Sequence, residues 1–242
     1  MGDRDSEWLQ VSGGLRMVAH AMMVQLLLVA FTLLTIMFVV SSKKADAMEG
    51  IALLLALIGL VAQVIMVAGV FKVSGQPPPR PSAGLAQAAG ALGLVGIAIS
   101  LYVLIILLQV TSVGPTSDHE AIRSAMEAAE RLPMIEVLAA VIGFLAMVLL
   151  MAAAAQVAGY FKQPDLERKA RTAIAMVLLA AAVYAFIKLG ITPREPASLI
   201  AALVMTTIVQ IAAFVTILGT VRGLADAVLG SPPTELPRAR SL

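Results

Sequence analysis

Five polar side chains stand inside long apolar stretches of this sequence, where a hydrogen-bonding group can act within a membrane. They are His20, Gln25, Gln63, Gln156 and Gln210. Gln25 lies nine residues after Arg16, and Gln63 lies nine residues before Lys72. At a helical rise of 1.5 Å per residue, both amides lie roughly 13 Å from the same membrane surface. We predict that these two amides face each other within hydrogen-bonding distance.

This polar layer has two interpretations. It could form a vestibule for a small uncharged solute, with Gln156 and His20 nearer the surface and Gln210 deeper. Alternatively, the same side chains could hydrogen-bond neighbouring helices to each other, which stabilises a bundle by roughly 0.6 kcal/mol per pair. The sequence favours the second interpretation, because such pairs are common in membrane bundles.

The residues that catalytic and cofactor sites need are missing. The chain has no cysteine, which excludes disulfides and thiolate-bound metals. Its two histidines, His20 and His119, are expected on opposite sides of the membrane, so they cannot share a haem or a metal ion. No metal-binding HExxH, no phosphate-binding GxxxxGK[ST] and no serine, histidine and aspartate set facing one compartment is present. We therefore expect no enzymatic activity and no cofactor.

Ionisable groups within the membrane are also expected to be absent. Proton pumps and ion-coupled carriers place such groups inside their membrane helices. Between the flanking charges of each apolar block we find no Asp, Glu, Lys or Arg, and we assign every carboxylate to a loop or tail. The sequence thus argues against coupled transport.

Six apolar blocks must position these side chains. Of 242 residues, 60% are hydrophobic and 13% are charged, against roughly 25% charged in soluble domains. The blocks reach the roughly 20 residues that cross a bilayer, and they are continuously apolar, which indicates helices and not barrel strands. We predict an all-α, polytopic membrane protein with a membrane domain at 17–225, between a cytoplasmic segment 1–16 and a cytoplasmic tail 226–242. Its six transmembrane helices are expected at about 17–40, 50–71, 83–111, 134–161, 168–189 and 197–221.

The distribution of basic residues predicts the orientation. Eleven of the 17 Lys and Arg residues fall in the termini and in the second and fourth loops, and six fall in the other three loops. Because basic residues are retained on the cytoplasmic side, both termini are expected inside the cell, in the inner (plasma) membrane. The bases are scattered between the blocks, so their expected partner is anionic lipid and not nucleic acid.

Two loops have recognisable patterns. The second loop, 75–81, contains four prolines and should form a stiff, extended spacer. The third loop contains a capping box at Ser117 and Glu120, followed by apolar residues at helical spacing. We predict a short amphipathic helix at 118–132 on the outer surface, ending before Pro133 starts the fourth transmembrane helix.

Small residues suggest helix packing and a repeat. The words VAGVFK and VAGYFK end the second and fourth blocks, and a related glycine occurs near the end of the sixth, which favours three tandem helical hairpins. Small side chains let membrane helices approach closely. The packing glycines are predicted to be Gly69, Gly90, Gly93, Gly96, Gly159 and Gly219.

Together these features predict a structural or accessory subunit without a catalytic centre, which packs on another membrane subunit or on a second copy of the chain. The alternative is a passive channel or small-solute facilitator. The outer halves of the blocks carry few polar groups, which favours the accessory subunit, because a pore needs polar groups along its length.

Overall fold

The computed structural model describes residues 3–42, 48–77, 82–112, 119–188 and 196–230. These residues form six α-helices, and no strand occurs among them. The helices are α1 Asp3–Ser42, α2 Met48–Ser74, α3 Ala83–Ser112, α4 His119–Tyr160, α5 Pro164–Lys188 and α6 Pro196–Gly230. Each contains a segment long and apolar enough to cross a membrane. The prediction of an all-helical, multi-pass membrane protein is confirmed at this level.

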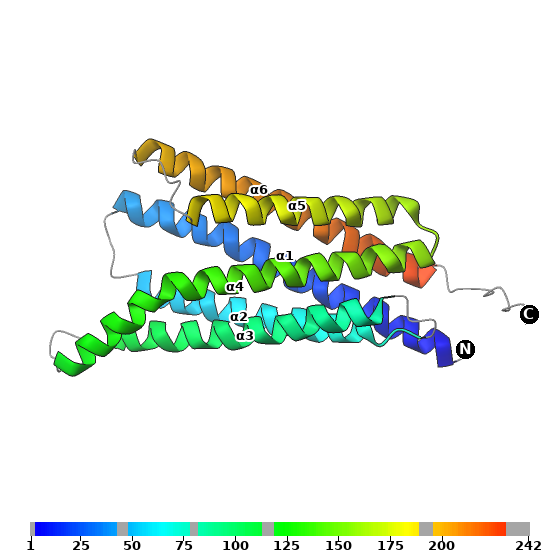
Figure 1. The fold of residues 1–242 in the computed structure, drawn as a ribbon, viewed down its shortest axis with the longest axis horizontal. Coiled ribbons are helices and arrows are strands. Elements are labelled where there is room, and N and C mark those ends of the chain that lie inside the picture. Colours follow the sequence, from blue (N-terminus) through cyan, green and yellow to red (C-terminus); the bar gives the residue numbers. More distant parts are fainter. Residues whose placement is uncertain (1–2, 43–47, 78–81, 113–118, 189–195, 231–242) are drawn as a thin grey trace, which may run out of the picture.

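The six helices pack as a closed ring. Each helix contacts the next one along the chain, and α1 also packs against α6. The start of α1 and the end of α6 lie at the same end of the bundle (Figure 1), which we call the terminal end; the opposite end is the far end. Because all consecutive pairs are in contact, the packing does not separate three hairpins, and that grouping stays a prediction.

Two helices extend beyond their predicted ends. Helix α1 begins at Asp3 and not near residue 17, and Trp8, Val11 and Leu15 are buried in the core. Helix α6 continues to Gly230 and not to residue 221. The prediction treated Arg16 as the limit of a membrane block, whereas its side chain lies on the exposed face while apolar residues continue along the buried face. Residues 3–16 therefore belong to α1 and to the bundle.

The helix predicted at 118–132 is helical from His119, but it is not separate from the fourth membrane helix as expected, and its place on the outer surface stays a prediction. Helix α4 is continuous from His119 to Tyr160, and Pro133 lies inside it. The first part of α4 runs at an angle to the rest in Figure 1. An interior proline removes one backbone hydrogen bond and bends a helix without always ending it.

The proline-rich loop begins as a compact turn. The Gln76 side chain is buried and donates through Nε2 to Ser82 Oγ at 2.6 Å, while the Ser82 amide donates to Gln76 Oε1 at 3.3 Å. These bonds hold residues 76 and 82 close together. Of the predicted spacer 75–81, residues 78–81 lie outside the described part of the chain, so its extended form stays a prediction.

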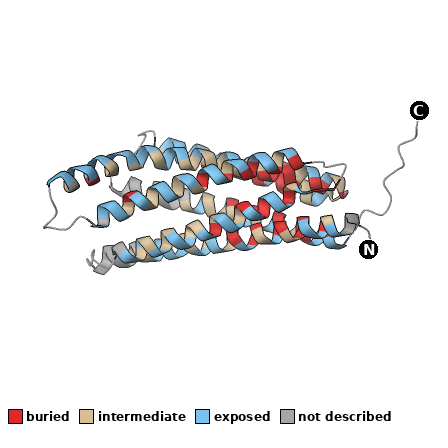
Figure 2. Cartoon of the chain, turned by 90° about the horizontal axis from the view of Figure 1, so that it is seen from below, coloured by how far each residue is buried: buried red, intermediate tan, exposed pale blue. Residues whose placement is uncertain are grey.

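The core is confined to the terminal end. Buried apolar side chains occur in α1 up to Met22, in α2 from Ala62 and in α6 from Ala213. In the described parts of α3, α4 and α5, the buried apolar side chains also lie in the half nearer the terminal end, except Ile106 and Ala125. Figure 2 shows the buried residues gathered toward the terminal end. The bundle is tightly packed there and more open toward the far end.

Small residues explain this division. A methyl group placed on Gly14 of α1 would lie 2.6 Å from the Gly69 carbonyl oxygen of α2, so these two backbones are in direct contact. The terminal halves of α3 and α4 are rich in Ala and Gly, including Ala86, Ala153 and Ala158, all buried. Small side chains allow close approach of helices, whereas the Leu and Ile that dominate the far half of α3 hold backbones apart.

Candidate binding chamber

A cavity of about 320 Å³ lies inside the ring of helices. Its polar lining comes from Gln25 of α1, Gln63 of α2, Tyr184 of α5 and Gln210 of α6, and α4 supplies apolar residues such as Phe144. Helices α2 and α5 are not neighbours in the ring, so a space that touches both lies in the interior and not in a groove on the outside.

A second cavity, of about 520 Å³, adjoins the first. It is lined by residues of α2, α3, α4 and α5, among them Gln63, Ser100, Glu136 and Tyr184. Gln63 and Tyr184 line both cavities. We call the two cavities together the chamber; all six helices contribute to its wall.

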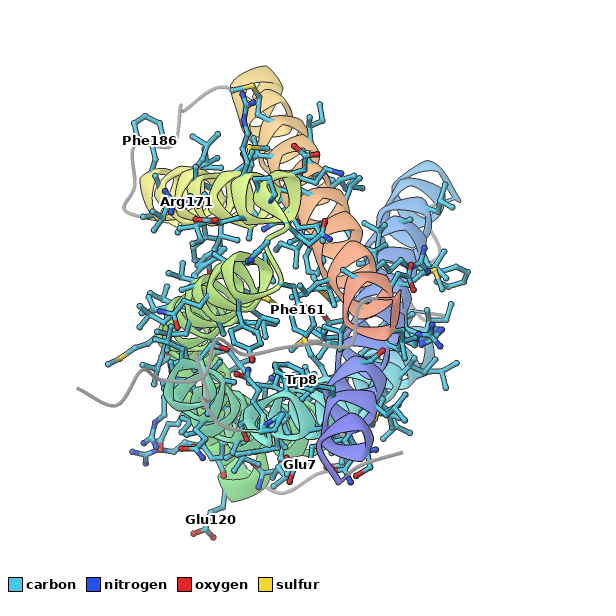
Figure 3. All side chains as sticks on the ribbon, turned by 90° about the vertical axis from the view of Figure 1, so that its right-hand side faces the viewer. Glu7, Trp8, Glu120, Phe161, Arg171 and Phe186 are labelled. Atoms are coloured by element: carbon cyan, nitrogen blue, oxygen red, sulfur yellow. The ribbon has the colours of Figure 1, made fainter. Side chains whose placement is uncertain are left out.

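The chamber is closed toward the terminal end by aromatic side chains. Trp8 of α1 packs edge-on against Phe161, with ring centroids 4.8 Å apart, and stacks on Tyr160 at 5.7 Å. Trp8 and Phe161 occupy the centre of the ring when it is viewed from the terminal end (Figure 3). Both are buried, together with Val11, Leu15 and other apolar residues of the terminal core. The described side chains of this end therefore pack across the centre of the ring, between the chamber and the terminal end.

The best-defined polar contact in the chamber joins α2 to α3. The Ser100 hydroxyl donates to Gln63 Oε1 at 2.9 Å. Gly96 makes this approach possible, because a methyl group there would lie 2.7 Å from Gln63 Nε2. Gln25 and Gln63 line the same cavity, as their equal depth suggested, while Gln63 Oε1 accepts the bond from Ser100; the direct pairing of the two amides stays a prediction.

The predicted polar layer is only partly assembled. Gln25, Gln63 and Gln210 line the chamber, as the interpretation of a vestibule requires. His20 and Gln156 are exposed and line neither cavity. Their positions on α1 and α4 put them on the outer faces of these helices, which depth along the helix could not reveal.

The predicted packing glycines fall into two groups, those that contact a neighbouring helix closely and those that do not. Gly69 contacts α1, and Gly90, Gly93 and Gly96 pack against Phe71, Val67 and Gln63 of α2, so these three glycines of α3 face a helix of the same chain. A methyl group on Gly219 would meet nothing within 4 Å, and one on Gly159 would approach only Glu167. A contact that we did not predict occurs at Gly223, which packs against Leu166.

These differences bear on the proposed repeat. Gly69 and Gly159 are equivalent in the matching words VAGVFK and VAGYFK, yet only Gly69 contacts another helix closely. Lys72 lies within α2, whereas Lys162 follows α4 with a left-handed φ of 53°. The tandem repeat therefore stays a prediction from sequence alone.

The chamber contains a carboxylate that the sequence analysis missed. Glu136 lies inside the apolar segment of α4 and lines the chamber wall with Ser100 and Tyr184. The assignment of every carboxylate to a loop or tail was wrong. Glu136 follows Pro133, which we took as the start of a membrane helix, so its charge was counted among the residues that flank a block. The signal was its position two residues inside the predicted range 134–161.

Within the described residues, no three His, Asp or Glu side chains are grouped so that they could hold a metal ion. No protein-family model matches the sequence, and neither a curated protein nor a solved structure is significantly similar to it. The side chains that line the chamber are therefore the basis for its chemistry.

Proposed function

We propose that this protein is a non-catalytic, multi-pass membrane protein that admits a small, largely apolar molecule into its central chamber. This corresponds to the facilitator that was the second expectation from sequence. The observation that carries the proposal is the chamber itself: amides from α1, α2 and α6 and the Tyr184 phenol converge on one interior space.

The character of the lining supports this choice of ligand. Apolar side chains such as Met66, Phe144 and Phe214 make up most of the wall, and a few polar groups lie among them. Sites for small molecules have this composition, with volumes of roughly 300–1,000 Å³. The apolar part of a ligand would replace contacts with lipid, while the amides would orient its polar group.

The closed terminal end supports access from one side. Trp8 and Phe161 block the centre of the ring, whereas the far halves of the helices pack loosely. In this conformation the molecule enters from the far side or from the adjoining lipid. Passive transfer to the other side would require Trp8 and Phe161 to separate.

Binding can be tested with a variant that fills the chamber. Gly143 lines the cavity, and a methyl group there meets nothing within 4 Å, so Gly143→Leu should occupy chamber space without a clash. Gly219→Leu is the matched control, because Gly219 is equally unobstructed but lines neither cavity. We expect phenylbutanol binding to the purified protein to fall by at least about tenfold in Gly143→Leu and by less than about twofold in Gly219→Leu. Equal binding by all three proteins would refute the proposal.

The orientation in the inner (plasma) membrane is part of the same proposal. The excess of basic residues at the termini and in the second and fourth loops supports cytoplasmic ends. A reporter that works only outside the cytoplasm should be active when inserted near Asp118 and silent when fused after Leu242. Equal activity at the two sites would contradict this orientation.

The accessory subunit is the second candidate. Fewer of the predicted packing glycines are open to a partner subunit, because Gly90, Gly93 and Gly96 are already covered by α2. Gly219 of α6 remains exposed and uncovered, as a glycine that packs on a partner subunit would be in the isolated chain. Gentle extraction from native membranes tests this candidate: a stoichiometric membrane partner that is lost in Gly219→Leu would favour it over the facilitator.

A further inference from the structure

We infer that the chamber prefers a protonated amine with an apolar body over a neutral or anionic molecule of the same shape. This inference rests on the proposed function and specifies the class of ligand. It comes from the sign of the charge in the chamber wall and from the groups around that charge.

The wall contains one acidic side chain. Glu136 is the only Asp, Glu, Lys or Arg among the described residues that line the two cavities, and it is exposed. A carboxylate attracts a ligand ammonium group and repels a ligand carboxylate.

The neighbours of Glu136 provide acceptors for the remaining ammonium protons. Ser100, Gln63 and Tyr184 line the same cavity and carry hydroxyl or amide oxygens. An ammonium group has three donors and no acceptor, so a wall that presents several oxygens around a carboxylate suits it. A neutral hydroxyl can use only some of these groups.

Aromatic rings next to this region add to the preference. Phe144 and Tyr184 pack against each other with ring centroids 6.1 Å apart, and both line the chamber. The face of an aromatic ring attracts a cation within about 6 Å of its centroid. Tyr184 also lines the cavity that contains Glu136, so one ligand can use the ring and the carboxylate together.

The apolar part of the ligand has a place in the other cavity. That cavity lies against Met66, Met147 and Phe214 and contains no acidic or basic side chain. Because Gln63 and Tyr184 belong to both cavities, the boundary between them is where the head and the body of the ligand would meet. The chamber thus has separate surroundings for an ammonium head and an apolar tail.

Three probes of equal shape test the inference: phenylbutylamine, phenylbutanol and phenylbutanoate. Their binding to the full-length protein in a neutral detergent is measured by equilibrium dialysis. We expect the amine to bind at least about tenfold more tightly than the alcohol, and the carboxylate to bind most weakly. In Glu136→Gln the preference for the amine should fall to within about twofold of the alcohol. Retained binding of the alcohol shows that this variant is folded.

Glu130→Gln is the matched control, because Glu130, like Glu136, is an exposed carboxylate of α4, but it lines neither cavity. It should keep the full preference for the amine. Equal binding of amine and alcohol by the unaltered protein, with alcohol binding still reduced by Gly143→Leu, would overturn the inference and leave the proposed function intact. Tighter binding of the carboxylate would overturn the inference as well. If Gly143→Leu changes the binding of no probe, both the inference and the proposed function fail.

Discussion

Two adjacent glycines of α1 should respond in opposite ways to the same substitution. Gly14 faces α2, and an added methyl group would lie 2.6 Å from the Gly69 carbonyl oxygen and 2.8 Å from Lys72 Cβ. Gly13 is its neighbour in sequence, but a methyl group there meets nothing within 4 Å. Gly14→Ala and Gly13→Ala therefore change the same helix by the same atoms, and they differ in whether the new methyl group touches α2.

The magnitudes follow from two effects. Replacing Gly by Ala in a helix interior stabilises the helix by roughly 0.5–1 kcal/mol, and this gain applies at both positions. At Gly14 the helices must also separate by about 0.8 Å to restore a contact of 3.4 Å, and overpacking of this kind costs roughly 1–3 kcal/mol. We expect Gly13→Ala to be neutral or stabilising and Gly14→Ala to be destabilising by a net amount of up to about 2 kcal/mol.

Reversible unfolding in mixed micelles of neutral detergent and dodecyl sulfate, followed by circular dichroism, measures both variants against the unaltered protein. The prediction concerns the order of the three midpoints, with Gly14→Ala lowest. If Gly14→Ala is at least as stable as Gly13→Ala, α1 and α2 do not cross at these glycines, and the explanation of the tightly packed terminal end is wrong.

Three further predictions concern side-chain contacts, each measured by the same unfolding assay. Trp8→Ala should destabilise the protein by roughly 3–5 kcal/mol, because a buried aromatic ring is lost from the terminal core; a loss below about 1 kcal/mol would mean that Trp8 is not packed there. The Arg16–Asp226 pair should show a coupling of at most about 1 kcal/mol in a double-mutant cycle, since both side chains are more than half exposed; a larger coupling would contradict that exposure. Gln63→Leu with Ser100→Ala should show a coupling of roughly 0.6 kcal/mol, and purely additive effects would argue against their hydrogen bond.

The six helices could be predicted because length and continuous hydrophobicity determine them almost alone. Helices α2 and α3 begin and end within a few residues of their predicted limits. The start of α1 was missed because Arg16 interrupts the apolar run in sequence but not on the buried face, where Val11 and Leu15 continue it. Exposed charges mark the end of an apolar run more reliably than the end of a helix.

The chamber could be predicted only in part. Helical rise placed Gln25 and Gln63 at one depth, and both line the same cavity. Rise says nothing of direction around the helix axis, so His20 was included although it faces outward, and Ser100 was not recognised as the partner of Gln63. These contacts depend on how the helices are rotated against each other, which the depth of a residue along its helix does not specify.

Access to the chamber through the two ends of the bundle tests the central claim most directly. The chain has no cysteine, so a single cysteine introduced at Gln210 gives a signal without background from other thiols. Lys169→Cys, at the start of α5 near the terminal end, and Ser124→Cys, near the start of α4, serve as markers of the two sides, because both residues are exposed. In sealed vesicles of known orientation, we expect Gln210→Cys to react with a membrane-impermeant maleimide added on the Ser124 side and not on the Lys169 side. Reaction from the Lys169 side, or from neither side while both marker cysteines react, would contradict a chamber that is open at the far end and closed by Trp8 and Phe161.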